Sequence, residues 1–147
     1  MLEPIGLVLA LLPNDYPVLE TVNRLVPAIL AGNAILLKSS TDTPLLSQHF
    51  EAAFSEKAPG IAQDFFINTE DCKKVYEHKQ IRLVNFSGSH ASALDVYYDL
   101  AQNEFTNSDI DLGGFNIAYI GGSLASDEDL LNKAVEKCMW GSFYNSG

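Results

Sequence analysis

The sequence predicts an α/β fold, with a doubly wound, mostly parallel sheet in a single domain. Apolar runs of strand length alternate with segments of helical periodicity along the chain, which is typical of right-handed β-α-β crossovers. The first run, residues 6–12, is apolar throughout, as expected of a strand buried on both faces of a parallel sheet. The length of 147 residues suits one domain with a substantial core.

The remaining elements follow in order after this first strand, which Pro13 closes. Apolar residues recur at helical spacing from Leu19 to Leu30, and Gly32-Asn33 is a typical helix stop. Pro27 is expected to kink that helix or to divide its first turns. Further strands are predicted at 34–37, 64–68, 81–86 and 115–120, and further helices at 44–56, 71–78, 91–102 and 127–144.

Charge and composition exclude several classes of protein. The 19 acidic and 9 basic residues give a net charge of −10, so we expect no nucleic-acid partner. No apolar run reaches the ~18 to 20 residues of a bilayer span, and no basic signal-peptide region precedes the first strand. We therefore expect a cytoplasmic protein with no membrane partner. Cys72 and Cys138 form no CxxC pair and have no neighbouring histidine pair, so neither a metal site nor a disulfide is expected.

Ligands of such sheets bind beyond the carboxyl ends of the strands, so the loops there are candidates for the site. These loops are predicted at 13–17, 38–41, 86–89 and 111–114. No GxGxxG follows the first strand, so phosphate binding is expected instead at Ser87-Gly88-Ser89, where glycine lets backbone approach an anion at a helix start. Taken alone, Ser89 is more often a simple helix cap.

Two further side chains in these loops have both a functional and an ordinary interpretation. Lys38, with the hydroxyls of Ser40 and Thr41 close behind it, could hold ribose or phosphate oxygens, although a lysine at a strand end is usually solvated. Asp111 precedes Gly113-Gly114, which could place a carboxylate in tight backbone near a reacting group, although acids are also common in turns.

Taken in order, these segments resemble the motifs of the aldehyde dehydrogenase superfamily. Residues 3–17 resemble its E-P-x-G-V and P-W-N-F-P segment, residues 26–33 its L-A-P-A-L-A-A-G-N helix, and residues 38–44 its K-P-S-E-Q-T-P run. Residues 86–89 are similar to F-T-G-S, residues 110–114 to L-E-L-G-G, and residues 134–136 and 145–147 to A-V-E and N-x-G-Q. The resemblance covers essentially all 147 residues, in the family's order.

The resemblance implies a Rossmann-like domain of an enzyme that oxidises an aldehyde to a carboxylic acid with NAD or NADP, through a cysteine thioester. The implied partners are the nicotinamide dinucleotide and, for the full-length enzyme, a small aldehyde; a homo-oligomer is possible only in the full-length form. By position, Asp15 replaces the Asn that binds the oxyanion, and Asp111 replaces the general-base Glu. The implied cofactor-binding residues are Leu12, Pro13, Asn14, Lys38, Ser40, Thr41, Phe86, Ser87, Gly88, Ser89, Leu112 and Gly113.

Both catalytic positions depart from the family pattern. An ionised Asp15 can only accept hydrogen bonds, and loss of one oxyanion donor costs roughly 3 to 4 kcal/mol of barrier. Asp111 keeps a carboxylate, but its side chain is one methylene shorter than that of Glu. The family's nucleophilic cysteine follows the N-x-G-Q run, and no cysteine occupies that position in residues 1–147.

Three hypotheses therefore stay open. The chain is expected to be a partial aldehyde dehydrogenase, namely its NAD(P)-binding domain at residues 1–147 up to just before the catalytic cysteine, without the preceding helices and the catalytic domain. The alternative is a non-catalytic nucleotide-binding module or pseudoenzyme subunit, and the third hypothesis is an interaction remnant without a ligand. In each case, we expect no aldehyde turnover from residues 1–147 alone.

Overall fold

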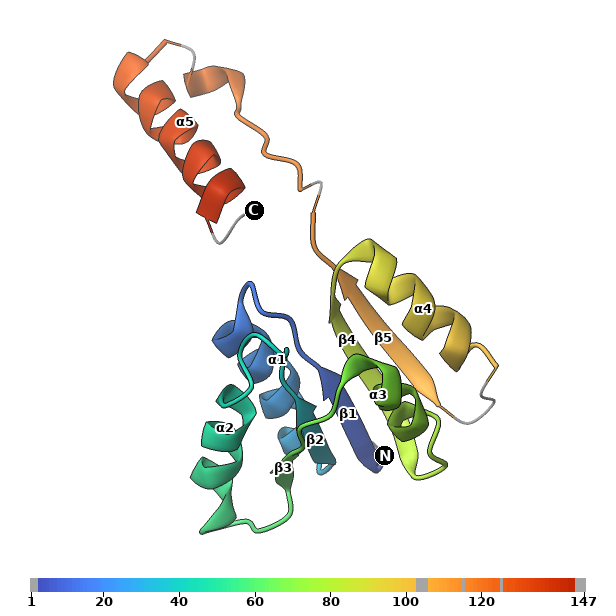
Figure 1. Ribbon diagram of the computed structural model, residues 1–147. Coiled ribbons are helices and arrows are strands. Elements are labelled where there is room, and N and C mark those ends of the chain that lie inside the picture. Colours follow the sequence, from blue (N-terminus) through green and yellow to red (C-terminus); the bar gives the residue numbers. More distant parts are fainter. Residues whose placement is uncertain (1–2, 103–105, 115, 125, 145–147) are drawn as a thin grey trace. The chain divides into compact units, whose positions relative to one another are not determined.

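The computed structural model describes residues 3–102, 106–114, 116–124 and 126–144 (Figure 1). The chain divides into two compact units, Met1–Gly113 and Gly114–Gly147. The first unit contains the five-stranded sheet and every residue named above as a catalytic or cofactor-binding candidate. Each unit is described by itself.

The first unit is built on a parallel sheet of five strands in the order β3-β2-β1-β4-β5 (Figure 1). This confirms the predicted α/β class and the doubly wound, parallel sheet. The order reverses between β1 and β4, which makes their carboxyl ends the topological switch point. The strands are β1 Leu7–Leu11, β2 Ala34–Lys38, β3 Ala62–Asp64, β4 Ile81–Gly88 and β5 Asn107–Leu112, and the helices are α1 Pro17–Leu30, α2 Leu46–Ser55, α3 Thr69–Tyr76 and α4 His90–Leu100.

The core lies on both faces of β1, as its unbroken apolar run predicts. Val8 and Ala10 belong to a buried cluster with residues of α1, β2 and β3, against which α2 also packs. Leu9 and Leu11 belong to a second cluster with residues of α3, α4 and β4. Because successive side chains of a strand point to opposite faces, α1 and α2 cover one face of the sheet, while α3 and α4 cover the other.

Helix α1 begins at Pro17, a position where proline's fixed φ is compatible with the first helical turn. Of the two effects expected of Pro27, a kink or a division of the helix, the division is wrong, because α1 continues through Pro27 to Leu30. Leu25 and Ala28 bury one side of the helix in the core. The hydroxyl of the buried Thr21 donates to the Pro17 carbonyl at 2.7 Å, which satisfies this polar group inside the helix.

Two of the predicted strands are misplaced. The third strand is Ala62–Asp64 rather than 64–68, and the last one is β5, Asn107–Leu112, rather than 115–120. Strand β5 is mostly polar, but it pairs with residues 83–88 of β4, and its partly buried Ile110 packs on the α3–α4 cluster. Residues 116–120 form no strand, and Ile117 is 95% exposed. An apolar pattern makes a strand only where a neighbouring strand completes its hydrogen bonds.

In the second unit, the described residues form the short helix η1, Gly122–Leu124, and helix α5, Glu128–Phe143. The predicted helix at 127–144 is thus present. Its first turn is capped by Asp127, whose side chain accepts a hydrogen bond from the Leu130 N–H at 3.0 Å. None of the helices in the described parts of the chain is long and apolar enough to cross a membrane.

The entry into β1 depends on the buried side chain of Asn33, in the turn before β2. Its Oδ1 accepts a hydrogen bond from the Gly6 N–H at 2.9 Å, and the Ala34 N–H donates to the Gly6 carbonyl at 3.2 Å. Gly6 has φ of +121°, a conformation that glycine adopts without strain. These contacts join the starts of β1 and β2.

We expect Asn33→Ala to lower the free energy of unfolding of the first unit by about 1 to 3 kcal/mol, because the substitution leaves the Gly6 N–H without its acceptor. Urea unfolding followed by circular dichroism measures this loss. The matched control is Asn23→Ala, since Asn23 lies exposed on α1 and its side chain donates to Glu20, at 3.3 Å. Equal losses in the two variants would show that Asn33 has no special role.

Candidate functional site

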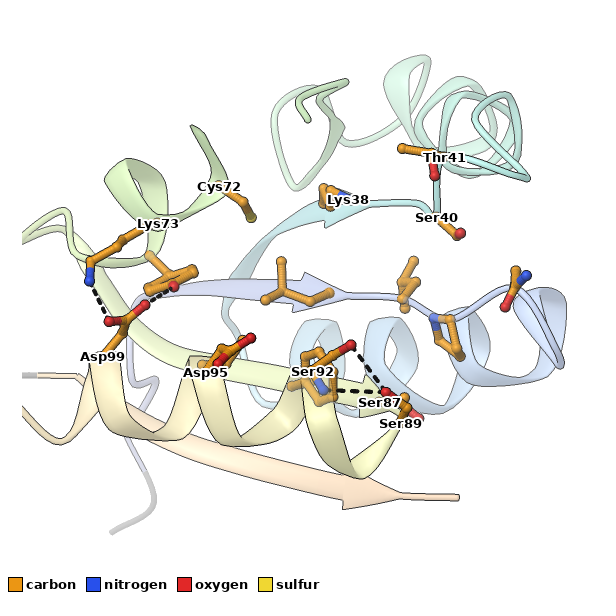
Figure 2. A pocket seen from close by; sticks show the side chains of 18 of the residues that line it. Lys38, Ser40, Thr41, Cys72, Lys73, Ser87, Ser89, Ser92, Asp95 and Asp99 are labelled. Atoms are coloured by element: carbon orange, nitrogen blue, oxygen red, sulfur yellow. Dashed lines mark hydrogen bonds and ion pairs between the residues drawn. The ribbon is translucent and has the colours of Figure 1, made fainter. Parts of the chain in front are cut away.

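A pocket of about 520 Å³ lies at the carboxyl ends of β1, β2 and β4 and along α3 and α4 (Figure 2). It is therefore at the switch point of the sheet, where ligands of such folds bind. Ten of the twelve residues expected to bind a cofactor line this pocket, all but Leu112 and Gly113. Those that line it are Leu12, Pro13, Asn14, Lys38, Ser40, Thr41, Phe86, Ser87, Gly88 and Ser89.

The ends of β1 and β2 form one wall of the pocket and are tied together. The Leu12 N–H donates to the Lys38 carbonyl at 3.0 Å, which continues the pairing of the two strands by one residue. Beyond the ends of the two strands, Asn14 Nδ2 in the loop after β1 donates to Asp42 Oδ2 in the loop after β2, at 2.7 Å. The loop after β1 and the loop after β2 are thus held side by side, with the side chains of Lys38, Ser40 and Thr41 facing the pocket (Figure 2).

The end of β4 and the start of α4 form a second wall. Ser89 is the N-cap of α4, and its Oγ accepts a hydrogen bond from the Ser92 N–H at 3.3 Å, so the ordinary interpretation of Ser89 as a cap is confirmed. A Cβ at Gly88 would lie 3.0 Å from Cζ of Phe86, so glycine leaves room for this ring. The start of α4 thus borders the pocket through Ser89 and Ser92, and the first N–H groups of a helix have no acceptor within the helix itself.

The third wall, made by α3 and α4, was not expected from the loops. Tyr76 donates from its hydroxyl to Asp99 Oδ2 at 2.7 Å, and the Lys73 ammonium pairs with Asp99 Oδ1 (Figure 2). The sequence did contain a signal for this wall, because the helical spacing of Ser92, Asp95 and Asp99 places them on one side of α4. The pocket residues missed by sequence reasoning are Leu11, Glu70, Cys72, Lys73, Tyr76, Ser92, Asp95, Val96 and Asp99.

Charges and burial shift several pKa values in this wall. The Lys73 ammonium, followed by the Tyr76 hydroxyl, holds the pKa of Asp99 below its usual range by hydrogen bonding to the carboxylate. Burial, with a smaller effect of Asp99, raises the pKa of Tyr76. Burial also raises the pKa of the Cys72 thiol, and the positive charge of Lys38 only partly offsets this rise. Cys72 is therefore a protonated, buried thiol at neutral pH.

The two catalytic candidates do not line this pocket. Asp15 is half-buried in the loop after β1, and its Oδ1 accepts a hydrogen bond from the Tyr16 N–H at 2.9 Å. Asp111 lies within β5 rather than in a loop, and its carboxylate pairs with Arg24 of α1 at 3.1 Å. Since Ile110 faces α3 and α4, Asp111 faces the opposite side of the sheet.

The remaining candidates lie near the edge of the pocket or outside the described residues. Gly113 donates its N–H to the Gly88 carbonyl at 3.3 Å, which places it beside β4 without lining the pocket. Leu112 is the last residue of β5 and is 42% exposed. Residues 145–147, which carry the N-x-G-Q resemblance, lie outside the described residues.

We expect Asp99→Asn to lower stability slightly at pH 7, as for a partly exposed ion pair. Because the folded pKa of Asp99 is depressed, its contribution is complete above the unfolded value of about 3.9 and is lost as pH falls through the lower folded pKa. The stability gap between wild type and variant should therefore narrow below pH ~4. Urea unfolding at pH 7 and pH 3 tests this, with Asp95→Asn on the same helix as control. A gap independent of pH would contradict it.

Comparison with known proteins agrees with this geometry. The profile of the aldehyde dehydrogenase family matches residues 1–147. The chain is similar to D-glyceraldehyde dehydrogenase (NADP(+)) of Thermoplasma acidophilum, with 29% identity over 98% of this chain and 29% of that protein. It is also similar to the EPTC-inducible aldehyde dehydrogenase of Rhodococcus erythropolis, with 30% identity over 91% of this chain and 27% of that protein.

Solved structures show the same fold. An aldehyde dehydrogenase of Mycobacterium tuberculosis complexed with NAD+ matches with a TM-score of 0.71 and 30% identity, over 76% of this chain and 23% of that one. An aldehyde dehydrogenase from Bartonella henselae matches with a TM-score of 0.83 and 24% identity, over 99% of this chain and 30% of that one. The chain thus spans less than a third of the length of these relatives. It belongs to the aldehyde dehydrogenase family.

Proposed function

We propose that the pocket binds a nicotinamide dinucleotide, NAD or NADP, and that residues 1–147 include the NAD(P)-binding domain of an aldehyde dehydrogenase. The observation that carries this proposal is that one pocket at the switch point gathers ten of the twelve cofactor candidates from three separate loops. The names of similar proteins add support, since one relative is named for NADP(+) and one similar structure holds NAD+.

The residues present fit a dinucleotide. The start of α4, with its cap Ser89, offers N–H groups and a hydroxyl to a phosphate. Lys38 and the hydroxyls of Ser40 and Thr41 would hold oxygens of the ribose or its phosphate on the opposite wall. The bound nicotinamide would accept hydride from the substrate, which in the whole protein we propose to be a small aldehyde that is oxidised to the acid.

A second candidate function is a nucleotide-binding module without catalysis. It is favoured by the environment of the two catalytic candidates. Arg24 engages the carboxylate of Asp111 at 3.1 Å, and a base role requires that carboxylate to leave its partner. Asp15 offers an acid where the family uses an amide. Dinucleotide binding by the whole protein without turnover of any aldehyde would favour this second function.

The first test of the proposed function is direct binding. Titration of the purified chain with NADPH and NADH, followed by nucleotide fluorescence, should give saturable binding. Lys38→Met should weaken it by about tenfold, as expected for the loss of one charge-assisted hydrogen bond. The matched control is Lys57→Met, because Lys57 is exposed after α2 and does not line the pocket. No saturable binding by the wild type would refute the proposal.

The second test concerns the choice between the two cofactors. Thr41 stands at the position where the family carries the Glu that binds the adenosine ribose hydroxyls, and its neighbour Asp42 is engaged by Asn14. Without that Glu, we expect the chain to bind NADP more tightly than NAD, because no carboxylate at position 41 repels the 2′-phosphate.

Competitive titration of NADP+ and NAD+ against the wild type and two variants measures this choice. Thr41→Glu should reverse the preference by about tenfold through charge repulsion, whereas Thr41→Gln, which is neutral and of the same length, should not. Clearly tighter binding of NAD+ by the wild type would sink the idea, and equal effects of the two variants would assign the change to side-chain size.

A further inference from the structure

A hydrogen-bonded network of three side chains, Ser39, Ser47 and the partly buried Asp64, lies directly behind the loop that carries Ser40 and Thr41. Ser39 Oγ donates to Ser47 Oγ at 2.8 Å, and Ser47 Oγ in turn donates to Asp64 Oδ1. Both serines are buried, with 4% and 0% exposure respectively. The Asp64 N–H donates to Glu51 Oε2 at 3.1 Å. This network thus joins the end of β2, the first turns of α2 and the end of β3.

The network also caps α2, through a residue that precedes the helix by several positions in the sequence. The N-cap position of α2 is Leu45, whose side chain cannot accept a hydrogen bond from the first turn. Ser39 Oγ performs this role instead, because it accepts the Ser47 N–H at 3.1 Å. Residues 40–45 therefore form a loop before α2, and two hydrogen bonds between Ser39 and Ser47 close it at its base.

The loop is ordered from within as well. The Thr43 N–H donates to the Ser40 carbonyl at 3.0 Å, and the Asp42 N–H donates to Ser40 Oγ at 3.3 Å. Ser40 and Thr41 line the pocket, whereas Ser39, Ser47 and Asp64 do not. The network is therefore placed to act on a ligand only through the loop that it holds.

We propose that Ser39, Ser47 and Asp64 are positioning residues, which hold Ser40 and Thr41 at the pocket and through them set the choice between dinucleotides that differ at the adenosine ribose. The proposal rests on the proposed function, because it assumes a dinucleotide in this pocket. Its physical basis is that a buried hydroxyl or N–H left without a partner costs free energy, so the loop keeps the conformation in which these groups are paired.

The test uses Ser39→Ala and Ser47→Ala, with Asp64→Asn as the conservative variant that keeps an acceptor for Ser47. Ser55→Ala is the matched control, because Ser55 lies exposed on α2 and its hydroxyl donates to the Ala52 carbonyl, at 3.0 Å. The primary measurement is the ratio of the dissociation constants of NADP+ and NAD+. A variant that is merely less folded weakens both by the same factor and leaves this ratio unchanged.

We expect Ser39→Ala and Ser47→Ala to change the ratio by about three- to tenfold, equivalent to one net hydrogen bond, while Asp64→Asn and Ser55→Ala keep it near the wild-type value. Hydrogen exchange without ligand supplies the second measurement, and the amides of residues 40–46 should exchange faster in Ser39→Ala. Ratios unchanged in both alanine variants, or a ratio changed equally by Ser55→Ala, would overturn the proposal.

The two proposals fail in different ways. If the wild type binds neither dinucleotide, the proposed function is refuted, and with it the role of the network in selectivity. The hydrogen-exchange experiment then decides whether the network holds the loop. If the wild type binds a dinucleotide but the amides of residues 40–46 exchange equally in wild type and Ser39→Ala, the positioning role is refuted and the proposed function stands.

Discussion

The structure depends most on the burial of β1 on both of its faces. Leu9 and Ala10 are completely buried, yet they belong to the clusters on opposite sides of the sheet. A strand in this position must be central, and its two neighbours, β2 and β4, run parallel to it. Parallel neighbours end at the same edge of the sheet, so the loops after β1, β2 and β4 meet there. The pocket is a consequence of this arrangement.

The polar groups at that edge are ordered by hydrogen bonds in and behind the pocket wall. Ser89 caps α4, Ser39 caps α2, and the Lys38 carbonyl accepts the Leu12 N–H. These bonds satisfy backbone groups that the ends of helices and strands leave unpaired. They also leave Lys38, Ser40 and Thr41 turned toward the pocket, where they can meet a ligand without first being reordered.

On the other face of the sheet, near β5, ion pairs connect a helix to the strand. Arg24 bonds to Asp109 at 2.9 Å and to Asp111 at 3.1 Å, and thereby holds α1 against this strand. Within the described residues, Arg24 Nε and the Oδ1 of Asn85 on β4 are buried without a hydrogen-bond partner. Asp111, the candidate for the general base, is thus part of an ionic contact between α1 and β5, on the side away from α4.

Local pattern in the sequence was enough to determine the fold class, the central strand, the helices and the loops that form the pocket, because apolar periodicity and strand-end loops follow from short-range chemistry. The local pattern predicted the strands wrongly where pairing with a neighbouring strand decides whether a segment forms a strand. The polar β5 is a strand because β4 offers it an edge, whereas the apolar residues 117–120 have no strand beside them among the described residues of their unit. It also could not show that Lys73, Tyr76 and Asp99 close one wall, or that Asp111 pairs with Arg24. These contacts join residues distant in sequence, and only the packing of helices on the sheet brings them together.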